Sequence, residues 1–213
     1  MNFSPNNFYI GVIDLFAIIL PGSIVALALY YYNHDQADVF LRTTGQSDFF
    51  SAFVLLFASY LFGHIISQAS AYLDKYLYDK VKDKIYKNQT LLNHVKKVRT
   101  DVYRNTPEDL NLVSTYEWAQ LKLQKELPLV VQEAERYIAD SKFFRSLLLI
   151  LFVLGFVLLF NKNYSLSPSC FLIAGFSLIR YFHKRQKAVK TLYKGIVFIE
   201  MLNGKLQGIK HPS

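Results

Sequence analysis

Apolar residues in this chain are gathered into four blocks, and most charged residues lie between them. The blocks cover residues 8–32, 49–73, 143–160 and 169–182. As a helix rising about 1.5 Å per residue, the first block reaches roughly 37 Å, enough to cross a hydrocarbon core of about 30 Å. A soluble domain spreads its apolar residues through amphipathic segments instead. The sequence therefore predicts an all-α fold with multi-pass transmembrane helices, about four spans in number.

The blocks divide the chain into four parts. We predict transmembrane helices 1 and 2 over 8–68, a cytosolic helical domain over 69–142, transmembrane helices 3 and 4 over 143–184, and a basic cytosolic tail over 185–213. The central part holds 13 Lys and Arg and 11 Asp and Glu residues, as expected for helices in water. Helix starts are predicted at Thr106 with Pro107 and, more weakly, at Ser114 with Glu117. Pro128 opens a further helix that runs into the third block.

Charge sets the predicted orientation in the membrane. The chain has 24 Lys and Arg residues against 16 Asp and Glu residues, a formal charge of +8. The two short loops between spans hold only Arg42 and Lys162 among these cations, so the central part and the tail belong on the cytosolic side. We predict a bacterial inner (plasma) membrane protein with both termini in the cytosol. The first block is too long for a cleavable signal peptide, so we expect it to remain as a span.

Four residues of the first two blocks are candidates for a pore or gate. Asp14 is a carboxylate inside an apolar run, which is costly unless the group is paired, hydrated or neutralised. His64 lies at a similar depth in the antiparallel second span, so the two form a candidate pore pair or, alternatively, a structural hydrogen bond. A position near the helix N-terminus is a further explanation for Asp14. Pro21 and Gly22 interrupt the first block, and we expect a kink or break there.

Small residues in the second block predict close helix packing. Ser59, Gly63 and Ser67 recur every four residues, a pattern that lets helices approach closely in lipid. Short spans with polar or small faces need partners, so we expect a homo-oligomer within the lipid bilayer.

A compact basic cluster lies in the central part. Its candidate anion-binding residues are His94, Lys96, Lys97, Arg99 and Arg104. Such a cluster binds phosphates of a nucleotide or oligonucleotide, or lies against anionic lipid. A solvated helical face with no ligand is the other explanation. Aromatic residues are not interleaved in the way that stacks bases, and no reading of duplex DNA is expected.

Motifs of catalysis and metal binding are absent from the sequence. We find no Gly-rich phosphate loop, no His-Glu-x-x-His and no Gly-x-Ser-x-Gly. The single cysteine, Cys170, excludes an internal disulfide and a thiolate metal cluster. We expect no catalytic residues, no metal, no cofactor and no enzyme activity.

Two stretches carry a resemblance to a known group of proteins. They are DLFAIILPG over 14–22, and EAERYIADSKFFRSLLL over 133–149, an acidic helix that leads into a span. Together with the four-span layout, they resemble small bacterial membrane effectors of antiphage defence, of the Hailong type. The resemblance implies an oligomeric ion channel, opened by an oligonucleotide signal from a partner nucleotidyltransferase, that depolarises the infected cell in abortive infection. The alternatives are a membrane-anchored scaffold without conduction and a membrane enzyme acting on lipid or nucleotide, the latter disfavoured by the missing motifs.

Overall fold

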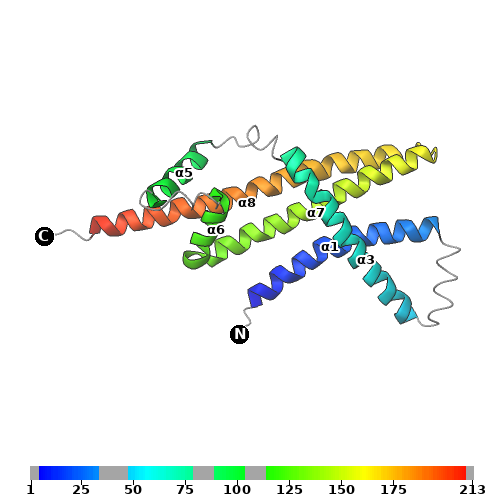
Figure 1. The fold of residues 1–213 in the computed structure, drawn as a ribbon, viewed down its shortest axis with the longest axis horizontal. Coiled ribbons are helices and arrows are strands. Elements are labelled where there is room, and N and C mark those ends of the chain that lie inside the picture. Colours follow the sequence, from blue (N-terminus) through cyan, green and yellow to red (C-terminus); the bar gives the residue numbers. More distant parts are fainter. Residues whose placement is uncertain (1–4, 34–47, 79–88, 104–113, 210–213) are drawn as a thin grey trace. The chain divides into compact units, whose positions relative to one another are not determined.

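The computed structural model describes residues 5–33, 48–78, 89–103 and 114–209, and within these ranges it is entirely helical. Six α-helices and one short π-helical turn make up the described residues, and Figure 1 labels the α-helices. The helices are α1 (Pro5–Tyr32), α3 (Asp48–Leu73), the π-helical turn η1 (Asp74–Tyr78), α5 (Gln89–Tyr103), α6 (Thr115–Glu126), α7 (Pro128–Phe160) and α8 (Ser167–Ile209). The predicted all-α fold is confirmed over the described residues.

Two of the predicted helix starts fall within this part of the chain. The Ser114 hydroxyl accepts a hydrogen bond from the Glu117 N–H at 3.2 Å, and the Glu117 carboxylate accepts one from the Ser114 N–H at 2.9 Å. This reciprocal capping box begins α6, as predicted. Pro128 begins α7, which continues without interruption into the third apolar block. The start predicted at Thr106 and Pro107 lies outside the described residues.

Two helices, rather than the four predicted, are long and apolar enough to cross a membrane among the described residues. They are α3 over Phe49–Leu73, with a mean hydropathy of 2.0, and α7, with a mean hydropathy of 2.7. In α1 the described apolar stretch, Ala17–Tyr32, is shorter. In α8 the apolar residues are too few before Arg180 and His183 interrupt them within the same helix.

The chain divides into two compact units. Unit 1 comprises Met1–Val81 and Ala139–His183, and unit 2 comprises Lys82–Ile138 and Lys184–Ser213. Each unit has its own pattern of buried side chains.

Unit 2 is built like a small soluble domain. Its core is apolar and contains Val95, Trp118, Ala119, Leu123, Val131, Ala134, Val189, Leu192, Tyr193, Ile196 and Ile199. The last five residues of this core come from the segment predicted as a basic tail. That segment forms the second half of α8, and its apolar side chains pack against α5, α6 and α7 within unit 2.

Two lysines of α8 also contact α7 within unit 2: Lys184, the last residue of the predicted fourth-span segment, and Lys187 of the predicted tail. The Nζ atoms of Lys187 and Lys184 lie 4.5 Å and 5.5 Å from the centre of the Tyr137 ring. A hydrogen bond to the Tyr137 hydroxyl raises the pKa of Lys187 above its ordinary value of 10.5.

Unit 1 buries polar side chains as well as apolar ones such as Ile150 and Leu151. All the buried polar or charged side chains of the described part belong to it: Ser59, Ser70, Ser141, Arg145, Ser146, Ser167 and Ser177. Many large apolar side chains are exposed, for example Phe49 at 82%, Phe160 at 82% and Phe176 at 69%. Water disfavours such a surface, whereas hydrocarbon requires polar groups to find partners inside the protein.

Candidate functional site: an ion pair among apolar helices

Arg145 is the charged residue that stands out in unit 1. It lies in α7 and is only 7% exposed, although it directly precedes a long apolar run. An arginine cannot shed its proton under physiological conditions, so burial requires a negative partner and hydrogen-bond acceptors. The structure supplies both from α3 and η1.

All three nitrogens of the Arg145 guanidinium donate hydrogen bonds. Nη1 donates to a carboxylate oxygen of Asp74, forming an ion pair. Nε donates to the Ser70 hydroxyl at 3.2 Å, and Nη2 donates to the Ser67 carbonyl oxygen at 3.4 Å. These contacts offset the desolvation of the charge and determine where α7 meets α3.

The second oxygen of Asp74 joins a third helix to the pair. The Tyr181 hydroxyl of α8 donates a hydrogen bond to it, and Tyr181 is almost fully buried. The ring of Tyr78 lies 6.4 Å from that of Tyr181 and 6.5 Å from that of Phe182, both measured between ring centres. One carboxylate therefore connects α7 and α8 to the end of α3.

The backbone at Asp74 has an unusual local conformation. Asp74 is the first residue of the π-helical turn η1, which follows α3 directly. A π-helical turn changes the angular position of side chains around the helix and often occurs at functional sites. In the same region the Ser70 and Ser146 hydroxyls lie 3.3 Å apart, within hydrogen-bond distance. No buried side-chain nitrogen or oxygen lacks a partner in the described part of the chain.

A second close contact joins α1 to α3. A Cβ atom added to Gly22 would overlap the Ser59 carbonyl oxygen, and one added to Gly63 would overlap the Ile18 carbonyl oxygen. The backbones thus approach closely where the small-residue pattern predicts. Pro21 is buried at this crossing, and α1 continues through it without a break.

The stripe of small residues does not face a single partner. Ser59 and Gly63 meet α1, but the Ser67 carbonyl accepts a hydrogen bond from Arg145 of α7. Residues four apart advance by about 40° beyond a full helical turn, so Ser67 is rotated about 80° from Ser59. That rotation turns the end of the stripe towards a different helix.

Of the two side chains in the proposed pore pair, the structure describes only that of His64. His64 packs edge-on against Tyr60, one turn earlier in α3, with ring centres 4.5 Å apart. The side chain of Asp14 lies outside the described residues, although its backbone belongs to α1. Pairing of Asp14 with His64 therefore stays a prediction.

The predicted anion-binding residues lie on α5 in unit 2. Nε2 of His94 lies 3.1 Å from a Glu200 carboxylate oxygen, and Arg99 donates to the Thr115 hydroxyl at 3.1 Å. Lys96 is exposed, and Arg104 lies outside the described residues.

A surface depression of about 490 Å³ adjoins this cluster. It is lined by His94, Lys97, Val98, Asp101 and Glu200. Two carboxylates thus share the depression with His94 and Lys97, and an incoming anion must compete with Glu200 for His94. This opposing charge was not recognised in the sequence, because Glu200 is 106 residues from His94.

Sequence reasoning also missed the ion pair of Arg145 with Asp74. A signal was present, since Arg145 lies near the start of the third apolar block and Asp74 directly follows the second. Among the described residues no group of three or more His, Cys, Asp or Glu side chains is arranged to hold a metal ion. Comparison of the chain with protein-family models, curated proteins and solved structures finds no match.

Proposed function

We propose that this chain is an integral membrane protein that self-associates into an ion-conducting pore, with unit 2 as its cytosolic control element. Membrane embedding is supported by the side chains of unit 1, where serines and an arginine are buried and many large apolar side chains are exposed. Some of the buried serines donate to carbonyl oxygens of their own helix, as Ser59 does to Leu55 at 2.7 Å and Ser177 to Ile173 at 2.9 Å, and Ser167 donates across to Gly155 of α7 at 2.9 Å. This is how polar side chains are accommodated in hydrocarbon.

The observation that carries the pore proposal is the ion pair of Arg145 with Asp74 inside this apolar unit. Ionisable groups among membrane helices are costly, and they commonly mark ion pathways or gates. Asp74 directly follows the second apolar block, Arg145 lies near the start of the third and Tyr181 lies near the end of the fourth. In the predicted four-span topology all three positions lie at the cytosolic ends of their spans. The cluster would then close the cytosolic mouth of the pathway.

Opening requires the carboxylate of Asp74 to leave Arg145. The separated charges then need water, which hydrates the path between α3, α7 and α8. We assign the trigger to an anionic nucleotide or oligonucleotide that binds the α5 cluster and displaces Glu200 from His94. In this proposal the protein is the depolarising effector of an antiphage defence system, in keeping with the resemblance carried by residues 14–22 and 133–149. A partner nucleotidyltransferase supplies the signal.

A membrane-anchored scaffold is the competing function. It is favoured by the separate apolar core of unit 2, which includes Trp118, Leu123 and Leu192 and which a docking platform also needs. In that case the ion pair only clamps helices together, and its loss affects assembly without any current.

Membrane potential in bacteria expressing the chain separates these functions. We expect the wild type to depolarise cells only when a nucleotide signal is co-produced. Asp74→Asn removes the negative partner, leaves a buried cation uncompensated at a cost of about 3 kcal/mol, and should depolarise cells without any signal. The double exchange Asp74→Arg with Arg145→Asp should restore the closed state. Lys190→Ala, at an exposed position of α8, is the matched control and should behave as wild type.

Three results would count against the pore. The wild type fails to depolarise cells with or without the signal. Asp74→Asn also fails to depolarise them. Both proteins are nevertheless found inserted in the membrane at normal levels. Together they favour the scaffold.

A further inference from the structure

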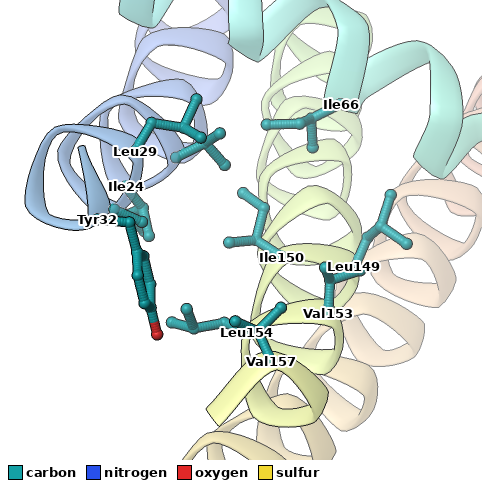
Figure 2. Close-up of a pocket in the computed structure, with 11 residues that line it drawn as sticks. Ile24, Leu29, Tyr32, Ile66, Leu149, Ile150, Val153, Leu154 and Val157 are labelled. Carbon is teal, nitrogen blue, oxygen red and sulfur yellow. The ribbon is translucent and has the colours of Figure 1, made fainter. Parts of the chain in front are cut away.

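An apolar groove lies in unit 1 between α1, α3 and α7. Its volume is about 370 Å³, within the range of about 300–1,000 Å³ that is typical of small-molecule sites. Figure 2 shows Ile24 and Leu29 of α1 on one side, Ile150 and Leu154 of α7 on the other, and Ile66 of α3 at one end. The exposed part of the lining is entirely apolar.

The lining restricts what can fill the groove. A water molecule needs two to four polar partners, and none of the exposed lining offers one. If the groove were empty, its lining side chains would lose their van der Waals partners. A hydrocarbon chain satisfies both conditions, because it needs no hydrogen bond and restores the contacts.

A polar contact lies next to one end of the groove. Tyr32 lines this end, and its hydroxyl accepts a hydrogen bond from the Asn161 side chain at 3.4 Å. Figure 2 shows this hydroxyl at the same end of the groove as Leu154 and Val157. The next residue, Lys162, is exposed and stands in a left-handed conformation with φ of 58° in the turn between α7 and α8. A tyrosine hydroxyl and an amide beside an apolar groove, with a cation at the next position in the chain, match the two parts of a phospholipid.

We propose that this groove binds one acyl chain of a bilayer phospholipid, with the lipid phosphate at Tyr32, Asn161 and Lys162. The inference rests on the membrane embedding proposed above. The lipid fills the space between α1 and α7 and holds these helices at a fixed separation. Because the site has a polar end, the lipid is retained through purification, unlike the lipids that merely surround the protein.

Lipid retention by the purified full-length chain tests the site. The protein is reconstituted in vesicles of phosphatidylethanolamine and phosphatidylglycerol, extracted in mild detergent and washed, and bound lipid is counted by native mass spectrometry. We expect one retained phospholipid per chain. Ala28→Trp and Val153→Trp place a bulky ring in the groove from α1 and α7, and each should lower retention at least about tenfold. Val153 is 54% exposed, so its replacement leaves the fold intact.

The matched control is Ile173→Trp, on an exposed face of α8 outside the groove, which should retain lipid as the wild type does. Asn161→Ala removes the amide at the polar end and should weaken retention without filling the groove. Equal retention by wild type and both groove variants overturns the site. A dimer that carries no lipid and dissociates in the groove variants also overturns it, since a second copy is then the occupant.

Failure of this inference is distinct from failure of the membrane proposal. If alkaline washing removes the protein from cell membranes, membrane embedding itself is wrong. If the protein resists that washing but keeps no lipid, the groove proposal alone is wrong.

Discussion

Replacing Gly63 by alanine tests whether α1 and α3 depend on close backbone contact. A Cβ atom on Gly63 would overlap the Ile18 carbonyl oxygen and lie 2.7 Å from Ile18 Cγ2. Carbon atoms in good contact are about 3.5–4.0 Å apart, so the two helices must separate by about 1 Å at the crossing. The obstruction is mostly backbone, and a change of side-chain rotamer cannot relieve it.

The expected loss of stability follows from two opposing effects. Overpacking of this kind costs about 1–3 kcal/mol, whereas alanine is favoured over glycine in a helix by up to about 1 kcal/mol. We expect a net destabilisation of about 1–2 kcal/mol. For a chain of this size, that corresponds to an apparent melting temperature lower by about 2–8 °C.

Thermal unfolding of the full chain in detergent, followed by circular dichroism, measures this difference. The matched control is Gly175→Ala in α8, where an added Cβ atom meets nothing within 4 Å. That variant should melt at or slightly above the wild-type temperature. The reasoning is refuted if Gly63→Ala melts as high as Gly175→Ala, because the two substitutions then differ only in position and not in packing cost.

Three further predictions concern both units. Leu123→Ala, at a position with no exposed surface in unit 2, should cost about 2–5 kcal/mol and lower the denaturant midpoint of the full chain. Hydrogen bonds to the N–H and hydroxyl of Ser114 lower the pKa of Glu117 below its ordinary value of 4.5. The ionised Glu117 therefore stabilises the folded protein above pH 4.5, and this stabilisation is lost as the pH falls through the lower pKa of the folded state. Melting between pH 5 and pH 3 should therefore depend less on pH in Glu117→Gln than in the wild type. If Asp14 and His64 form a pore pair, Asp14→Asn and His64→Ala should each change single-channel conductance in planar bilayers, and unchanged conductance and selectivity in both would remove them from the pathway.

Features that depend on neighbours within one or two helical turns could be read from the sequence. The capping box of Ser114 and Glu117, the helix start at Pro128 and the close approach at Gly63 all have this character. Each rests on residues three or four positions apart, or on the lack of a side chain, and helical geometry alone places these groups. The clustering of apolar residues likewise predicted helices of membrane-spanning length, of which α3 and α7 are found among the described residues.

The role of the C-terminal segment could not be read in this way. Its lysines suggested a solvated tail, and the apolar residues between them, such as Leu192 and Ile196, become meaningful only when α5, α6 and α7 pack against them. A basic stripe and a buried stripe coexist on one helix, and charge alone does not reveal the second.

Only the tertiary structure brings Asp74 and Arg145 together as an ion pair. Asp74 lies 71 residues from Arg145 and 107 from Tyr181, and no local rule links positions so far apart. The sequence by itself determined that each of the three stands where an apolar helix meets polar sequence. Whether their side chains meet depends on how each helix is rotated about its own axis, which the π-helical turn at Asp74 and the packing of α3, α7 and α8 settle together. The cost of burying Arg145 without a partner is the physical reason that they meet.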